Sequence, residues 1–250
     1  ATITITQTTY FRLQHYISHV ATVADQTLGR NNDIAGENEI YSQVIVEDLA
    51  TTVKSNSVGS TRVAVVKDQK NYNVDGGTFS GPSWRDRDLT VKDDPFNFVT
   101  LYPTTNGQTS ESPGNDPGYF SLPAGKYKIR FSAPAFKVDR HMAAMIWSSN
   151  ESDINKTYNP NTDHRDGETW GSSEYSQDDY GRVSNRSKGT FVVEITQTSY
   201  FKVIHHAQTS QGSNGFGEST NISSVDPETY TIVEIEDLAT ALKSGVNASD

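Results

Sequence analysis

The sequence predicts an all-β protein folded as an antiparallel two-sheet sandwich, and three observations support this prediction. The 250-residue chain holds 12 tyrosines and 10 phenylalanines beside many threonines and valines, and these residue types favour strands. Apolar residues make up only 34% of the chain and are gathered in short runs. Long stretches rich in Ser, Asn, Asp, Gly and Thr separate these runs, and such stretches are expected to form surface loops.

The apolar runs read as strands because several of them alternate between apolar and polar residues. The alternation is clearest in residues 126–131, where Tyr127, Ile129 and Phe131 face one way and the cationic residues face the other. Strands are expected, in chain order, at residues 61–66, 84–91, 96–102, 126–131, 138–147, 191–195, 200–207 and 230–235, with long loops at 71–81, 104–118 and 148–171. A two-sheet jelly roll accommodates this many short strands without a helix.

An internal repeat divides the chain. Residues 3–11 (ITITQTTYF) match residues 193–201 (VEITQTSYF) at an offset of 190 residues. Residues 41–55 match residues 230–244 at an offset of 189, and nine of these fifteen positions are identical. Two blocks in the same order and at nearly the same spacing indicate a duplicated structural unit.

The repeat predicts two domains. Residues 1–57 are interpreted as the C-terminal strands of a first jelly-roll repeat plus a linker, and residues 58–250 as a complete second repeat. The linker segment is placed at residues 49–60. A fragment with two or three strands cannot bury both faces of a sheet alone. We therefore expect the first fragment to be completed by a longer tandem array or by strands of another subunit.

Composition limits the partners. The net charge is −10 without a basic block, which argues against nucleic acid and anionic membranes as partners. No apolar run is long enough to predict membrane insertion. The absence of cysteine rules out disulfides and thiolate metal sites. No motif predicts a cofactor or a metal, and the acidic residues of the loop 151–179 fit no calcium-binding loop and are interpreted as solvated.

Six short motifs occur in order along the second repeat. They are DGGTF at residues 75–79, W-R-x-R-x-L at 84–89, F-x-L-x-A-G-x-Y at 120–127, SAPAF with V-x-x-H at 132–141, SSEYS at 172–176 and NGFG at 214–217. Together they resemble the C1q/TNF-like jelly-roll domain of bacteriophage tail-fibre and related virion structural proteins, over residues 61–236. The resemblance implies a homotrimer, a virion or extracellular location, and a structural or receptor-contacting role rather than catalysis.

Residues repeated on the strand that follows the ITQT motif are candidates for contacts between subunits. A histidine, His15 or His205, occupies the same repeat position in both copies. It is interpreted either as part of a metal-binding or pH-sensitive site at a trimer axis or as a packed, hydrogen-bonded strand histidine. The inter-subunit candidates are Tyr10, Phe11, His15, Tyr200, Phe201 and His205.

Aromatic residues of the long polar loop are the candidates for ligand binding, because aromatic rings can stack on sugars. Trp84 and Trp147 lie in expected strands and are assigned to the core instead. The ligand-binding candidates are Trp170, Tyr158, Tyr175 and Tyr180.

The sequence thus favours a non-enzymatic structural module of a virion fibre or extracellular filament, whose partners are copies of itself or neighbours in a tandem array. The alternative is an adhesin at a fibre tip that binds a host-surface glycan or receptor through loops 104–118, 151–180 and 208–224. A depolymerase is disfavoured, since nucleophile and nucleotide motifs are absent. The adjacent carboxylates Glu236 and Asp237 should point to opposite faces of their strand, which makes them a poor acid–base pair.

Overall fold

The computed structural model describes residues 62–103, 118–176, 183–220 and 226–238. Within these residues the chain is built from β-strands with one short 3-10 helix, Glu151–Asp153. No helix in this part of the chain is long and apolar enough to cross a membrane. The strands are β1 (Arg62–Lys70), β2 (Ser83–Asp86), β3 (Val91–Asp93), β4 (Thr100–Tyr102), β5 (Tyr119–Leu122), β6 (Gly125–Phe136), β7 (Asp139–Ser148), β8 (Gly167–Trp170), β9 (Glu174–Ser176), β10 (Ser184–Ile195), β11 (Ser199–Ala207) and β12 (Glu228–Asp237).

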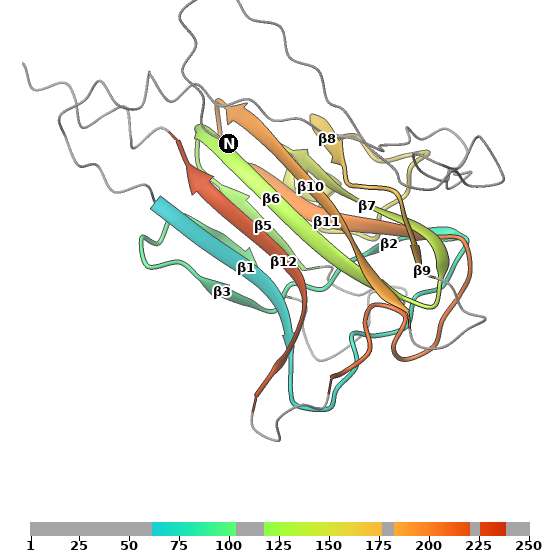
Figure 1. Cartoon of the computed structure of the whole chain (residues 1–250). Coiled ribbons are helices and arrows are strands. Elements are labelled where there is room, and N and C mark those ends of the chain that lie inside the picture. The colour runs from blue at the N-terminus through green and yellow to red at the C-terminus, as the bar shows by residue number, and fades with distance from the viewer. Residues whose placement is uncertain (1–61, 104–117, 177–182, 221–225, 239–250) are drawn as a thin grey trace, which may run out of the picture.

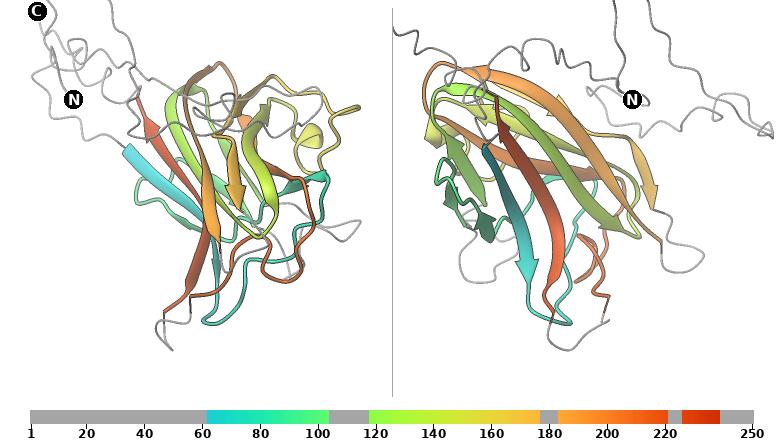
Figure 2. Two further views of the ribbon diagram at one scale, coloured as in Figure 1. Left: turned by 45° about the vertical axis from the view of Figure 1, so that its right-hand side comes forward. Right: turned by 60° about the vertical axis from the view of Figure 1, so that its left-hand side comes forward.

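The strands form two antiparallel sheets that pack face to face (Figures 1 and 2). The five-stranded sheet has the order β10–β6–β12–β1–β3. The seven-stranded sheet has the order β4–β5–β11–β7–β8, with β2 paired to β11 and β9 paired to β7. The fold class predicted from the sequence, an all-β antiparallel two-sheet sandwich, is confirmed.

The main hydrophobic core lies between the two sheets, where the inward residues of the alternating strands meet. On β6 these are Tyr127, Ile129 and Phe131, as their spacing predicts, and all three are buried. From the seven-stranded sheet, Phe201 and Val203 face them. Burying apolar side chains from both sheets is what holds such a sandwich together.

A second apolar cluster covers the outer face of the seven-stranded sheet. The chain between β7 and β8 folds back over this face and packs Ile154 and Tyr158 against it. Ile146 of β7 and Ile204 of β11 point outward into this cluster, so these two strands are apolar on both faces. The seven-stranded sheet is therefore covered on its outer face as well, through Ile154 and Tyr158, while most other residues of the segment 149–166 remain exposed.

Two of the expected strands differ in the structure. The expected strand 84–91 is wrong as one element, because the chain leaves the seven-stranded sheet after β2 and joins the five-stranded sheet at β3. Arg87 lies at this crossing and is fully buried. The expected strand 96–102 is reduced to β4, and β5, β8 and β9 are additional strands that the sequence reading missed.

The second copy of the repeat lies at the end of β10, the start of β11 and along β12. The first copy, with the domain predicted for residues 1–57, lies outside the described residues. In the part of the chain that the structure describes, the strands of both sheets lie within residues 62–237.

Candidate functional site

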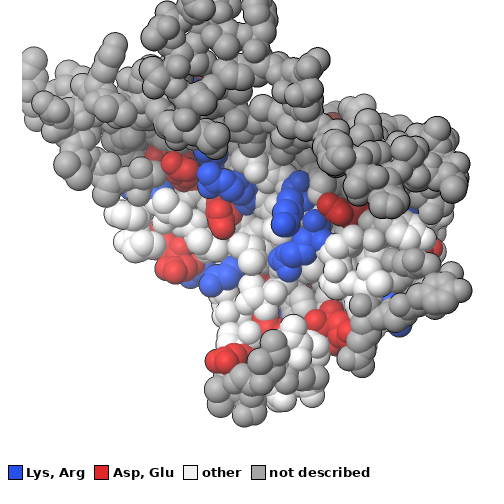
Figure 3. All heavy atoms as spheres, viewed as in Figure 1, with Lys and Arg blue, Asp and Glu red and all other residues white. Residues whose placement is uncertain are grey.

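The outer face of the five-stranded sheet carries a ladder of charges. Glu234 and Glu236 of β12 lie beside Lys128 and Arg130 of β6 in the register of these strands, and Lys128 is itself only 9% exposed. The guanidinium of Arg130 lies 3.7 Å from Glu234 and 3.9 Å from Glu236. Acidic and basic side chains accordingly lie side by side on this surface, which we call the charged face (Figure 3).

Exposed valines flank the charge ladder. Val63 of β1 pairs with Glu236, Glu236 pairs with Lys128, and Lys128 pairs with Val192 of β10. One cross-strand row therefore has an acid and a base at its centre and a valine at each end. Val63 is 43% exposed and Val192 is 48% exposed. The charged face thus combines complementary charges with apolar side chains that have no cover within the described residues.

The adjacent carboxylates at the end of β12 do face opposite sides, as the strand geometry predicts. Asp237 is buried and pairs with Arg62, whereas Glu236 belongs to the charged face. The described residues hold no group of three His, Asp or Glu side chains placed to bind a metal ion.

A polar network lies inside the sandwich around Arg87. Its guanidinium donates to the Thr231 hydroxyl at 2.8 Å and to the carbonyl oxygens of Pro134 and Phe216 at 3.2 and 2.9 Å. Burial lowers the pKa of Arg87 to about 10. The three acceptors come from β12, β6 and the loop before β12, so Arg87 ties together elements far apart in sequence.

Two buried histidines lie in the same interior. His141 Nδ1 is 3.0 Å from His205 Nε2, and His141 Nε2 is 2.8 Å from Asn185 Oδ1. Burial lowers the pKa of His141 to about 4 and lowers the pKa of His205 well below its ordinary value. Burial also lowers the pKa of His206, on the opposite side of the sheet beside Trp84, to about 4. All three rings are neutral near neutral pH.

The predicted inter-subunit residues do not gather on one surface. Tyr10, Phe11 and His15 lie outside the described residues. Phe201 and His205 are fully buried within a single chain. Tyr200 is half-buried beside Tyr102 and Tyr119 on the outer face of the seven-stranded sheet.

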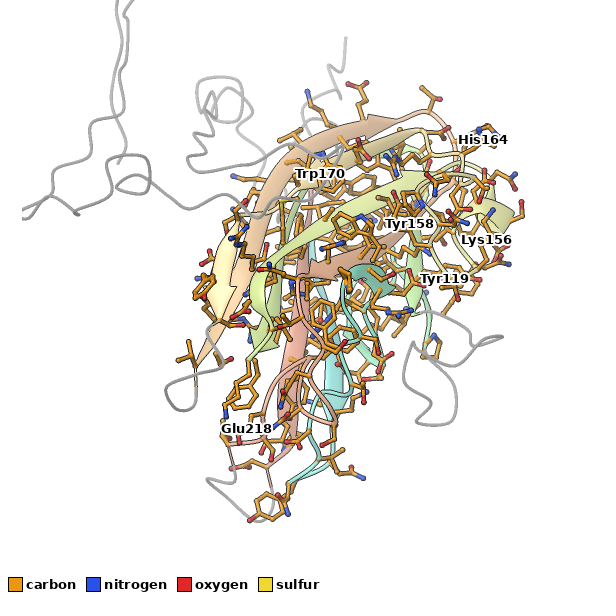
Figure 4. The ribbon with its side chains drawn as sticks, turned by 90° about the vertical axis from the view of Figure 1, so that its right-hand side faces the viewer. Tyr119, Lys156, Tyr158, His164, Trp170 and Glu218 are labelled. Carbon is orange, nitrogen blue, oxygen red and sulfur yellow. The ribbon has the colours of Figure 1, made fainter. Side chains whose placement is uncertain are left out.

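The predicted ligand-binding aromatics also differ in placement. Trp170 and Tyr158 are 7% and 4% exposed and pack on either side of Trp84 in the second apolar cluster, so they form no open stacking platform. Tyr175 is half-buried on β9, and Tyr180 lies outside the described residues. Figure 4 shows Tyr158 and Lys156 near Tyr119, whereas Glu218 lies at the far end of the molecule.

A hollow of about 430 Å³ opens at the end of the sandwich where β10 turns into β11. Trp147, Val193 and Ile195 contribute apolar surface to it. The polar residues that line it are Ser149, Asp166, Glu194, Thr196, Gln197 and Ser199. Sequence reasoning missed this site, although the repeated ITQT motif that forms its turn was the available signal.

These features define an all-β sandwich with a charged outer face, a neutral histidine interior and a polar end hollow. No family model matches the sequence, and no curated protein matches it. Among solved structures, the chain is similar to murine APRIL at pH 5.0, with a TM-score of 0.38 and 9% identity over 72% of this chain and 100% of that chain. It is also similar to the globular domain of zebrafish complement 1qA protein, with a TM-score of 0.33 and 11% identity over 72% of this chain and 98% of that chain.

Proposed function

We propose that this chain is a non-enzymatic structural module of a virion fibre or extracellular filament, and that it assembles with copies of itself into a trimer through the charged face. The observation that carries the proposal is the cross-strand row in which Val63 and Val192 flank the Glu236–Lys128 pair. The resemblance of the sequence motifs to tail-fibre domains supports the trimer and the virion setting.

The charged face suits a ring of copies of the same chain because its acidic and basic residues lie on different strands. Its acidic residues lie on β12 and its basic residues on β6, so around a three-fold axis the acidic strand of one copy can face the basic strand of the next in a head-to-tail contact. Covering the flanking valines removes apolar surface from water at roughly 25 cal/mol per Å². The charges at the centre of the row fix the register of such an interface, while the valines at its ends supply affinity.

Replacing both valines of the charged face with lysine tests this proposal. The V63K/V192K variant places a cation at each end of the row and is expected to dissociate the full-length protein into monomers. The measurement is molar mass by analytical ultracentrifugation or native mass spectrometry.

Val74 provides a matched control, because it is 44% exposed but lies in the loop after β1. The V74K variant should keep the mass of the unaltered protein. A monomeric unaltered protein, or a V63K/V192K variant with unchanged mass, would overturn the proposal.

A further inference from the structure

The hollow at the end of the sandwich is held open by the geometry of its surroundings. Gly167 lies against Trp147, and a Cβ at this position would collide with the indole ring. Phe191 stacks on the same indole with ring centroids 5.2 Å apart. The tryptophan is therefore fixed at the base of the hollow, whose volume falls within the roughly 300–1,000 Å³ range typical of small-molecule sites.

The carboxylate of Asp166 is positioned by the backbone. Its Oδ2 accepts a hydrogen bond of 2.6 Å from the amide of Ser149, and its own amide donates to the carbonyl of Trp147 at 2.9 Å. The side chain of Asp166 thus lines the hollow in a fixed place. Glu194 lines the hollow from β10, so two carboxylates border it.

Hydroxyl and amide groups complete the polar part of the hollow. Thr196 and Gln197 of the β10–β11 turn and Ser149 lie beside the carboxylates, and no Lys, Arg or His is among the described residues that line the hollow. A site with many acceptors and no cation repels anions and suits a neutral ligand that offers several hydroxyl donors.

The internal repeat singles out the same turn. Ile195, Thr196, Gln197 and Thr198 recur unchanged in the first copy of the repeat, at residues 5–8. Thr196 and Gln197 are exposed, and exposed polar substitutions ordinarily change stability by less than about 0.5 kcal/mol. Folding alone therefore gives little reason for both copies to keep these two side chains.

We propose that this hollow is a binding site for a neutral saccharide unit, held by the Asp166 carboxylate and the Thr196 and Gln197 side chains above the apolar base. The site adjoins the Val192 end of the charged face, because Val193 and Glu194 of β10 line it, and it adds ligand binding to self-assembly. Binding is measured separately from mass, so the failure of one proposal is distinguishable from the failure of the other.

The test uses the full-length protein on an array of neutral, amino and acidic oligosaccharides. Neutral glycans are expected to bind, and acidic glycans are not. Binding only to acidic or only to amino sugars would overturn the assignment, as would an array without binders.

Variants of the β10–β11 turn and of Asp166 then locate the site. For the neutral glycan that binds the array, the Q197A and D166N variants are expected to weaken binding in calorimetry at least tenfold. The T198A variant alters the same turn at a residue that does not line the hollow, and it should bind like the unaltered protein. Equal binding by Q197A, D166N and the unaltered protein, with unchanged melting temperatures, would overturn the proposal.

Discussion

The hydrogen bonds of Asn185 determine which ring nitrogen carries the proton in each of the two buried histidines. Its Nδ2 donates to the carbonyl of Tyr175 at 2.8 Å, so its Oδ1 must accept from His141 Nε2. Neutral His141 then accepts at Nδ1 from His205 Nε2. The acceptor that remains is His205 Nδ1, which is buried and has no hydrogen-bond partner among the described residues. A further proton would add a buried positive charge that has no acceptor to compensate it and is repelled by the Arg87 guanidinium.

Acidification is therefore expected to destabilise the protein. The folded-state pKa of His141 and of His206 is about 4, below the value of 6.5 in the unfolded chain. Between these values the unfolded chain binds more protons, so the free energy of unfolding falls as the pH falls, by up to ~3 kcal/mol for each histidine. Asp68 opposes this trend, because burial raises its pKa from 3.8 to about 6. Between these two values the folded chain binds more protons, so the contribution of Asp68 to the free energy of unfolding falls as the pH rises from about 4 to about 6.

Urea unfolding at neutral and mildly acidic pH measures this effect. The H141Q variant should show a smaller loss of unfolding free energy on acidification than the unaltered protein. H164Q serves as the control, because His164 is exposed, and it should keep the full pH dependence. An unfolding free energy that does not change between neutral and mildly acidic pH would contradict the histidine account.

At the scale of elements, a buried ion pair holds the segment 149–166 on the seven-stranded sheet. Lys202 Nζ lies 2.9 Å from Asp86 Oδ1 and donates to the carbonyl of Lys156 at 2.6 Å. The other carboxylate oxygen of Asp86 accepts from the amide of Tyr158 at 3.2 Å. Burial raises the pKa of Asp86, which shows the cost of placing this charge in the interior.

The K202M variant should lose about 3–5 kcal/mol of stability, because it leaves Asp86 buried without its cation. Lys188 offers a matched control: it is exposed on β10, and K188M should change stability by less than about 0.5 kcal/mol. Denaturant unfolding measures both variants. Equal stability of K202M and the unaltered protein would show that the ion pair does not hold the segment.

The sequence predicts the elements whose burial follows a simple period. The alternation of Tyr127, Ile129 and Phe131 gives the inward face of β6 correctly. The same alternation gives the wrong environment for Lys202 on β11. A lysine between apolar residues suggests a solvated face, but Lys202 is buried because it pairs with Asp86 on another strand. The sequence pattern predicts that Trp170 and Tyr158 lie in an open loop, because local patterning does not show that a second apolar cluster covers the sheet.

Arg87 illustrates the other limit of sequence reasoning. The run 84–91 is expected to form one strand, but burying the Arg87 guanidinium requires acceptors from Thr231, Pro134 and Phe216. Those acceptors are distant in sequence, so the crossing between sheets at Arg87 follows only from the tertiary structure. The end hollow was missed for the same reason, although its turn stood out in the repeat.

At the scale of the whole molecule, we propose that residues 58–250 form an independent unit. The described strands of both sheets lie within residues 62–237, and the main core joins side chains from both sheets. A chain beginning at residue 58 should therefore melt within about 4 °C of the full chain, a difference of ~1 kcal/mol. Calorimetry measures this, and loss of the cooperative transition would contradict the domain assignment.

The assembly itself provides the most direct test of self-association through the charged face. An electron cryo-microscopy map of the full-length protein is predicted to show three copies, with Val63 and Val192 of each covered by a neighbouring chain. A map in which these valines remain open to solvent, or in which copies meet only through the seven-stranded sheet, would contradict the account.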